Sequence, residues 1–285
     1  MSQPVHVDEL LSHAAARIGG DSARLDAELL LAHALGQGRT WLLAHADEVI
    51  DADACARIEP LIAARVRGVP IAHVLGRRGF WTHELEVTPD TLIPRPETEL
   101  LVELALTRIA CDGIGHDRSV RILDLGTGSG AIALAIAAER PLAHVTALDV
   151  SEEALIVARR NAATLCLRNV EFVLGDWCAT LAAQRYEVIV SNPPYLAEDD
   201  PHLEIGDLRF EPRLALVSGI DGLDAIRRIA SAAPAHLQPG GWLLIEHGWM
   251  QAAAVRELLI AAGLCELETQ RDLEQRDRVT LGRRP

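Results

Sequence analysis

Paired cysteines and long hydrophobic runs are scarce in this sequence, and each shortage excludes a class of protein. The five cysteines are scattered and form no C-x-x-C pair, so we expect neither a disulfide framework nor a metal site. No segment approaches the roughly 18 uninterrupted apolar residues that span a bilayer, and the N-terminus lacks the basic and apolar regions of a signal peptide. The composition therefore predicts a cytoplasmic protein that does not bind membranes.

Positive charge is also in short supply. Lys and Arg total 27 against 41 Asp and Glu, and the formal net charge is −14. Proteins that bind a nucleic-acid backbone usually present a broad basic face, so we expect no direct nucleic-acid partner. With 49% apolar and 24% charged residues over 285 positions, the chain has enough hydrophobic residues to form a large core. This length favours two domains, or one large domain with an appendage.

Residues 1–70 are predicted to form a small helical domain. Residues 7–18 and 22–35 carry apolar side chains at helical spacing, and each stretch ends at glycine. A third helical stretch over residues 52–67 contains Pro60, which either kinks that helix or begins a new one.

Residues 71–98 differ in character and predict a linker with a short hairpin, because glycines and prolines interrupt a run of β-forming side chains. From residue 99 to residue 285, strands alternate with helices. This alternation predicts an α/β domain with a largely parallel, doubly wound sheet of seven strands.

A glycine-rich loop follows the first predicted strand of that sheet, residues 120–125, and an apolar helix follows the loop. The loop residues are Gly126, Thr127, Gly128, Ser129 and Gly130. Glycines let the backbone turn tightly and approach a ligand, whose polar part can lie against the helix N-terminus. The pattern fits a nucleoside-containing cofactor, and both a nicotinamide dinucleotide and S-adenosylmethionine remain open. A tight turn without a ligand is the plainer alternative.

Acidic residues accompany the ends of the next two predicted strands. Asp149 lies about 20 residues beyond the glycines, where its carboxylate can accept hydrogen bonds from both ribose hydroxyls. Capping of the following helix is the alternative role for Asp149. Asp176 and Trp177 follow the strand after that, so Asp176 can bind an adenine amino group and Trp177 can pack on the purine. For Trp177, ordinary core packing is the competing interpretation.

The most specific motif is Asn192-Pro193-Pro194-Tyr195, which follows an apolar strand. The prolines hold the backbone extended and carry no N–H, so the segment presents two acceptors, the Asn192 carboxamide oxygen and the Pro193 carbonyl. These acceptors suit a planar –NH₂ group and orient its nitrogen toward an electrophile, while Tyr195 stacks on the group. The motif predicts nitrogen alkylation with Asn192, Pro193 and Tyr195 in catalytic roles. A rigid Asn-Pro turn is the alternative.

Together, DLGTGSG, Asp149 and NPPY resemble class I S-adenosylmethionine-dependent methyltransferases that modify adenine N6 or glutamine side chains. Further segments resemble the bacterial release factor glutamine methyltransferases more closely. These segments are FWTHELEVTPDTLIPRPETELLVE, SNPPYLAEDDP, FEPRLAL, IEHGW and DRVTLGR. The resemblance covers most of the chain, and residues 1–70 carry the fewest motifs.

The resemblance implies transfer of a methyl group from S-adenosylmethionine, leaving S-adenosylhomocysteine, to N5 of the glutamine in the Gly-Gly-Gln motif of class 1 peptide chain release factors. It implies a seven-stranded class I methyltransferase sheet preceded by a small helical domain that recognises the substrate. We expect a monomer.

With the motifs above, the resemblance gives two sets of site residues. The cofactor set is Gly126, Thr127, Gly128, Ser129, Gly130, Asp149, Asp176, Trp177 and Asn192. The substrate set is Phe80, Asn192, Pro193, Pro194 and Tyr195. Arg95 and Glu97 lie in a segment that approaches the active-site mouth in such enzymes, and a surface ion pair or a place at the start of a helix is the alternative for them.

Four other functions remain open at this point. A glutamine methyltransferase for a ribosomal protein shares the chemistry, and an adenine-N6 methyltransferase shares NPPY, although the net charge argues against it. A nicotinamide-dependent dehydrogenase fits the glycine loop but leaves NPPY unexplained. A non-catalytic binder of the release factor or the ribosome would keep the pocket only as a vestige. No spacing singles out a general base among Glu198, His202, Glu211 and His247.

Overall fold

The computed structural model describes residues 5–111, 119–181 and 183–285. Contacts between residues divide the chain into two units. One unit contains the residues up to Gly76 together with Glu204–Phe210, and the other contains Arg77–Leu203 and Glu211–Pro285. No helix in the described ranges is long and apolar enough to cross a membrane.

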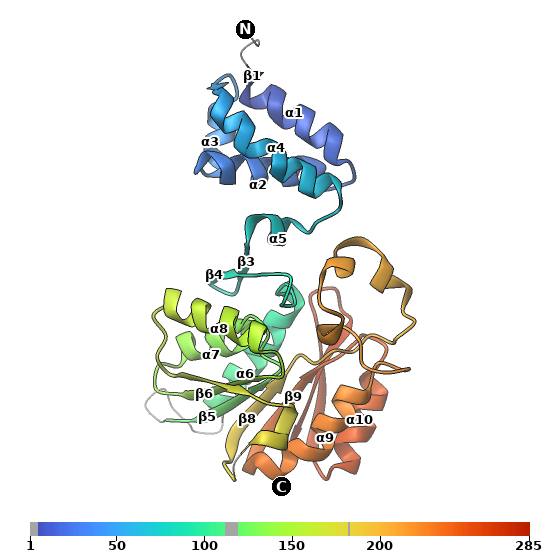
Figure 1. Cartoon of the computed structure of the whole chain (residues 1–285). Coiled ribbons are helices and arrows are strands. Elements are labelled where there is room, and N and C mark those ends of the chain that lie inside the picture. The colour runs from blue at the N-terminus through green and yellow to red at the C-terminus, as the bar shows by residue number, and fades with distance from the viewer. Residues whose placement is uncertain (1–4, 112–118, 182) are drawn as a thin grey trace. The chain divides into compact units, whose positions relative to one another are not determined.

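The smaller unit is mainly helical (Figure 1). Its elements are α1 (Val7–Ile18), α2 (Ala23–Leu35), α3 (Arg39–Ala44), α4 (Ala52–Val66), α5 (Ile71–Leu75), the 3-10 helix η4 (Gly206–Phe210), and the antiparallel pair β1 (Val5–His6) and β2 (Val49–Ile50). Apolar faces of α1, α2 and α4 meet in a core that includes Leu11, Leu30 and Ile62. Helix α4 continues through Pro60, so this proline does not begin a new helix.

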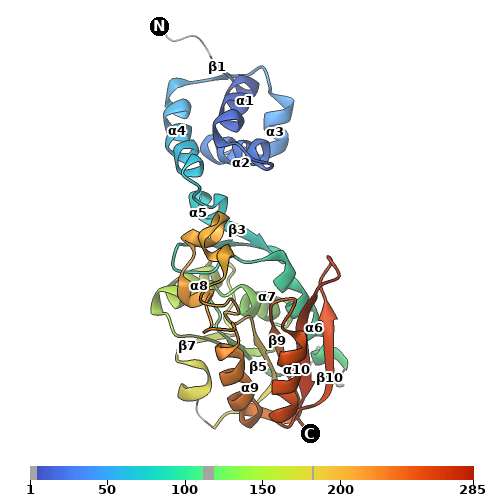
Figure 2. The same cartoon turned by 90° about the vertical axis from the view of Figure 1, so that its right-hand side faces the viewer.

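The larger unit is built on a mixed sheet (Figures 1 and 2). Over the described residues this sheet has seven strands in the order β10-β11-β9-β8-β5-β6-β7. Strands from β9 to β7 run parallel, and β11 is antiparallel to both of its neighbours. The strands are β5 (Arg121–Leu125), β6 (His144–Asp149), β7 (Val170–Leu174), β8 (Tyr186–Ser191), β9 (Leu237–Glu246), β10 (Cys265–Arg271) and β11 (Asp277–Arg283). The predicted α/β class, with a largely parallel, doubly wound sheet, is confirmed.

Helices cover both faces of the sheet (Figure 1). The core on one face includes α6 (Glu99–Cys111), α7 (Ala131–Glu139) and α8 (Glu152–Thr164), and the core on the other includes α9 (Asp224–His236) and α10 (Ala252–Ala261). Successive side chains of a strand point to opposite faces. Accordingly, Val188 and Val190 of β8 join the first core and Ile189 joins the second.

A hairpin of β3 (Arg77–Phe80) and β4 (His83–Glu86) precedes the sheet. Phe80 and Leu85 are buried in the core of the larger unit. The Asn161 side chain on α8 accepts a hydrogen bond from the Glu86 backbone N–H at 2.7 Å and donates one to the Glu86 carbonyl at 3.0 Å. These contacts attach the hairpin to the larger unit.

The strand order reverses at β5, because β6 and β7 follow on one side of it while β8 and β9 lie on the other. In doubly wound sheets, ligands bind outside the carboxyl ends of the strands at such a reversal. The loops that follow β5 and β8 are therefore the expected walls of a binding site.

Candidate active site

A cavity of about 500 Å³ opens at the carboxyl ends of the parallel strands. Each of four strands supplies part of its lining through the residues that follow or end it. These residues are Gly126 and Gly128 after β5, Asp149 at the end of β6, Gly175, Asp176 and Trp177 after β7, and Asn192 and Pro194 after β8. The cavity therefore lies at the predicted edge and brings the glycine loop, the acidic strand ends and NPPY together.

The glycine loop exposes bare backbone to this cavity. Gly126 and Gly128 adopt positive φ angles of +78° and +56°, which favour glycine over residues with a Cβ. A Cβ at Gly128 would meet no protein atom within 4 Å, so it would project into open space at the cavity wall. A Cβ at Gly126 would lie 3.4 Å from the Trp177 ring. The loop can thus approach a ligand closely on one side while the indole covers it on the other.

The remaining loop residues do not line the cavity but hold the loop in place. The buried Thr127 hydroxyl donates a hydrogen bond to Asp124 Oδ2 at 2.7 Å, and the Ser129 carbonyl accepts one from Asn161 Nδ2 at 2.9 Å. Gly130 caps the N-terminus of α7 with a positive φ of +87°. Of the five predicted loop residues, two face the ligand space and three support them.

Asp149 ties the glycine loop to the neighbouring strand. Its Oδ2 accepts a hydrogen bond from the Gly128 N–H at 2.8 Å, and its Oδ1 accepts one from the Ser151 N–H at 3.0 Å. Burial raises the pKa of Asp149, while these backbone donors lower it. The alternative role as a helix cap is wrong, because the N-cap of α8 is Ser151, whose hydroxyl accepts from the Ala154 N–H. Each carboxylate oxygen keeps a lone pair for a ligand hydroxyl.

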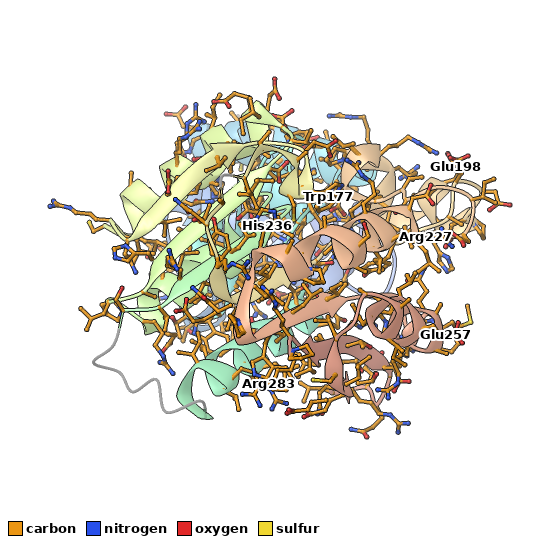
Figure 3. The ribbon with its side chains drawn as sticks, turned by 90° about the horizontal axis from the view of Figure 1, so that it is seen from below. Trp177, Glu198, Arg227, His236, Glu257 and Arg283 are labelled. Carbon is orange, nitrogen blue, oxygen red and sulfur yellow. The ribbon has the colours of Figure 1, made fainter. Side chains whose placement is uncertain are left out.

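Asp176 and Trp177 form the third side of the cavity, at the start of the 3-10 helix η2 (Trp177–Thr180). Trp177 lies beside α9, on which Arg227 and His236 are labelled (Figure 3). Its backbone has a positive φ of +50°, and its partly buried ring also packs on the core beneath α9. Asp176 Oδ2 accepts a hydrogen bond from the Arg228 guanidinium at 2.6 Å, and both side chains are about half exposed.

NPPY follows the buried end of β8, where the Ser191 hydroxyl donates to the Leu125 carbonyl of β5 at 2.7 Å. Asn192 and Pro194 line the cavity, whereas Pro193 and Tyr195 are not among the lining residues. The Tyr195 carbonyl accepts a hydrogen bond from Gln251 Nε2 at 3.0 Å. Burial raises the pKa of the Tyr195 phenol, so it stays neutral.

Two residues without an assigned role lie against Asn192. Asn192 Nδ2 donates a hydrogen bond to the Thr98 hydroxyl at 3.0 Å. Burial raises the pKa of Glu246 to about 7, and side-chain hydrogen bonds with Thr98 and Asn192 oppose that shift. Both residues lie in segments that carry the family resemblance, PRPETE and IEHGW. No spacing in the sequence connects either residue with Asn192.

A further residue missed at the glycine loop is Asp124, which lies in β5 and has no exposed surface. Burial raises its pKa to about 7, although the Thr127 hydroxyl donates to it. Loops that the sequence did not single out supply a further part of the lining. They contribute Asp90–Leu92 before η1 (Pro96–Thr98), Pro212, Leu214 and Ala215 around η5 (Arg213–Ala215), and Val217–Gly219 before α9.

Phe80 is not among the cavity-lining residues, and only 2% of its surface is exposed. Arg95 forms an ion pair with the buried Glu211 carboxylate rather than with Glu97. The second oxygen of Glu211 accepts from the Ile93 N–H at 2.9 Å. The pair thus joins two loops of the larger unit.

The residues considered as a general base have other surroundings. The His202 ring contacts Asp200 at 2.7 Å, and the buried His247 ring is hydrogen-bonded through both nitrogens, to the Gly248 carbonyl and the Thr280 hydroxyl. Burial lowers the pKa of His247. Within the part of the chain that the structure describes, neither these two histidines nor Glu198 and Glu211 line the cavity.

Comparison with known proteins agrees with this geometry. The family model for the PrmC N-terminal domain matches residues 9–76, and the model for the methyltransferase small domain matches residues 99–210. A methyltransferase structure from Pyrococcus furiosus aligns with a TM-score of 0.53 at 19% identity, covering 82% of this chain and 98% of that one. A 16S rRNA N2 methyltransferase from Thermus thermophilus, in complex with AdoMet and guanosine, aligns with a TM-score of 0.53 at 20% identity, and the alignment covers 73% of this chain and 50% of that one. The fold is that of class I methyltransferases.

Curated relatives define the family more narrowly. Proteins named release factor glutamine methyltransferase are 56% identical in Xylella fastidiosa, 53% in Pseudomonas aeruginosa and 48% in Escherichia coli. Each alignment covers 92% of this chain, and it covers 94%, 92% and 93% of the respective relative. The chain belongs to the release factor glutamine methyltransferase family, and the predicted resemblance is confirmed.

Proposed function

We propose that this protein transfers a methyl group from S-adenosylmethionine to N5 of the glutamine in the Gly-Gly-Gln motif of class 1 peptide chain release factors, and that S-adenosylhomocysteine is the second product. The observation that carries the proposal is the Asn192 carboxamide at the wall of the cavity that the glycine loop also lines. The names of relatives that match nearly the whole chain support the choice of substrate.

The residues of the cavity fit the proposed cofactor. The bare backbone at Gly128 leaves space that a Cβ would enter, and Asp149 has lone pairs for the two ribose hydroxyls. Trp177 can pack on the adenine ring, and Asp176 Oδ1 can accept from the adenine amino group while Oδ2 keeps its bond with Arg228. When bound, S-adenosylmethionine supplies an electrophilic methyl group on a positively charged sulfur.

We assign the substrate amide to the NPPY segment. The Asn192 carboxamide oxygen and the Pro193 carbonyl accept the two amide hydrogens, which orients the nitrogen and opposes delocalisation of its lone pair. The nitrogen forms its bond to the methyl carbon as the bond between carbon and sulfur breaks, and the nitrogen proton leaves to water. Pro194 lines the cavity and keeps the segment rigid, and we assign the neutral Tyr195 ring to stacking on the planar amide. For Phe80 we propose only an indirect role, because it is buried in the core of the larger unit.

The two parts of the chain have separate roles in this proposal. Residues 1–70 recognise the protein substrate, and residues 99–285 perform the methyl transfer. Residues 71–98 link these two parts of the chain. The acidic net charge of −14 supports a protein partner over a nucleic acid. We further propose that the protein acts as a monomer in the cytoplasm.

The test is to incubate a purified class 1 release factor with this protein and S-adenosylmethionine and to measure the mass of the intact factor. The expected result is the addition of one methyl group. A release factor in which alanine replaces the Gly-Gly-Gln glutamine is the control and should gain none. If cofactor binding is demonstrable but the release factor gains no methyl group, the substrate assignment is wrong, and ribosomal proteins are then the next candidates to assay.

A further inference from the structure

Three polar side chains from distant parts of the sequence meet beneath the cavity wall. Thr98 ends η1, Asn192 follows β8, and Glu246 ends β9. Strands β8 and β9 are parallel neighbours with Ser191 opposite Ile245, so the next residues along each strand, Asn192 and Glu246, are also adjacent. Thr98 is only 4% exposed and Glu246 only 1%.

The hydrogen bonds among these side chains have a defined direction. Asn192 Nδ2 donates to the Thr98 hydroxyl at 3.0 Å, and the Glu246 carboxylate lies close enough to Thr98 and Asn192 for their donor groups to lower its pKa. Above its pKa of about 7, the Glu246 carboxyl group is ionised and only accepts hydrogen bonds, and a hydroxyl has one hydrogen to donate. Because the Thr98 hydroxyl accepts a hydrogen bond from Asn192, its own hydrogen is left to point toward Glu246, and the NH₂ end of the Asn192 carboxamide faces Thr98.

The opposite orientation of the carboxamide is disfavoured. Rotating it by half a turn would place its oxygen against the Glu246 carboxylate, with two acceptors in contact and no proton between them, in a buried place where unpaired polar groups are costly. Burial raises the pKa of Glu246 to about 7 and the mostly buried Arg278 guanidinium opposes that rise, so this argument applies above about pH 7, where the carboxyl group is ionised. The oxygen of the Asn192 carboxamide is therefore free to accept a hydrogen bond from a donor in the cavity.

We propose that Thr98 and Glu246 are positioning residues that fix the Asn192 carboxamide with its oxygen toward the cavity, so that the site selects an NH₂ donor. This inference rests on the proposed function, because the donor in question is the glutamine amide. Neither residue lines the cavity, so both act on the substrate through Asn192.

Thr98→Val and Thr98→Ser test this role as a matched pair. Valine keeps the shape of threonine but removes the hydroxyl, and serine keeps the hydroxyl. We expect Thr98→Val to lower kcat for release factor methylation by about tenfold to a hundredfold, with KM and the Kd for S-adenosylmethionine changed by less than about threefold. Thr98→Ser should restore kcat to within about threefold of the wild type.

Thr146→Val is the control for loss of a buried hydroxyl, because Thr146 is buried in the middle of β6 and is not in the cavity lining. It should leave kcat unchanged. Glu246→Gln is the second variant. The glutamine amide can donate as well as accept, so it admits the reversed carboxamide, and we expect a lower kcat with an unchanged cofactor Kd.

The outcomes separate two claims. If the wild-type protein methylates the release factor and Thr98→Val matches it in kcat, the positioning role is wrong while the proposed function stands. The positioning role is also wrong if Thr98→Ser loses as much as Thr98→Val. If the wild-type protein does not methylate the release factor, the proposed function itself fails.

Discussion

At the scale of single residues, the cavity edge of the sheet holds two carboxyl groups that are poorly satisfied. Asp124 in β5 and Glu246 in β9 are both buried, and each keeps one oxygen without a hydrogen-bond partner among the described residues. Burial raises the pKa of each to about 7. Buried polar groups of this kind reduce stability, and their position beside the glycine loop and Asn192 suggests that they serve the site.

Asp124→Asn is expected to reduce the pH dependence of stability. The pKa of Asp124 in the folded protein, about 7, lies above its ordinary value of 3.8. Between these two values the folded protein holds a proton that the unfolded chain has released, so the free energy of unfolding falls as the pH rises through this window. Asp124→Asn has no carboxyl group at this position and therefore lacks this pH-dependent part of the free energy of unfolding. Glu246, whose pKa is also raised, makes the same kind of contribution in the wild type and in the variant.

Thermal melts at about pH 5 and about pH 8 measure this difference. The melting temperature of the wild type should fall more between the two pH values than that of Asp124→Asn. An equal fall in both proteins would contradict the proton-holding state of Asp124.

The sequence could identify Asn192 but not its two partners. Asn192 belongs to a motif of four consecutive residues whose backbone is restricted by two prolines, so local chemistry alone singles it out. Its hydrogen bond with Thr98 spans 94 positions of the chain, and such a contact follows from the packing of η1 against the end of β8. Asp149 was predictable because it sits at a strand end, where the sheet topology decides its neighbours.

At the scale of elements, the alternation of strands and helices was sufficient to predict the sheet, and the prolines and short helices were harder. Pro60 lacks an N–H and interior prolines cost about 3 kcal/mol in a helix, yet α4 passes through it. Ile58 and Ile62 on either side are buried in the core of the smaller unit, and burial of two such side chains offsets a cost of that size. The local sequence pattern around Pro60 does not reveal this stabilisation, because it comes from packing against other helices.

The loops that complete the cavity could not be predicted for a similar reason. Most residues from 212 to 219 line the cavity, and they lie in short irregular segments that have no periodicity to detect. The positive φ of Trp177 likewise depends on the tertiary contacts of its indole, since such a backbone angle is unusual for a bulky residue.

The glycine loop gives a prediction at this scale through the pair Gly128→Ala and Gly36→Ala. The two glycines have φ angles of +56° and +63°, and a Cβ at either would meet no protein atom within 4 Å. The backbone strain is therefore similar, about 1 kcal/mol in each variant. Only Gly128 lines the cavity, so only Gly128→Ala should weaken S-adenosylmethionine binding, by roughly tenfold or more.

Calorimetric titration with S-adenosylmethionine and thermal melts of both variants provide the measurement. Similar melting temperatures with a selective loss of affinity in Gly128→Ala are expected. If Gly128→Ala binds the cofactor as tightly as Gly36→Ala does, the glycine loop does not contact the cofactor at this position.

At the scale of the whole molecule, the smaller unit has its own apolar core, formed by α1, α2 and α4, and the cavity is lined entirely by residues of the larger unit. A glutamine in a protein loop offers little surface of its own for selectivity, so we expect recognition to need contacts beyond the amide. The smaller unit is our candidate for those contacts.

Removal of residues 1–70 should therefore separate binding of S-adenosylmethionine from recognition of the release factor. The shortened protein should keep its affinity for S-adenosylmethionine to within about threefold, while kcat/KM for the whole release factor falls toward the value for a short Gly-Gly-Gln peptide. Titration and steady-state methylation assays with both substrates measure this. Equal kcat/KM for the whole factor with and without these residues would assign the smaller unit a purely structural role.

The central claim is that Asn192 and its neighbours present a glutamine amide for methylation. Its most direct test is tandem mass spectrometry of a release factor treated with the wild-type protein or with Asn192→Ala, at equal occupancy by S-adenosylmethionine. We predict a single methyl group on the side-chain nitrogen of the Gly-Gly-Gln glutamine with the wild type, and transfer at least about 100-fold slower with the variant. Methylation of a different residue, or an equal rate with Asn192→Ala, would contradict the account.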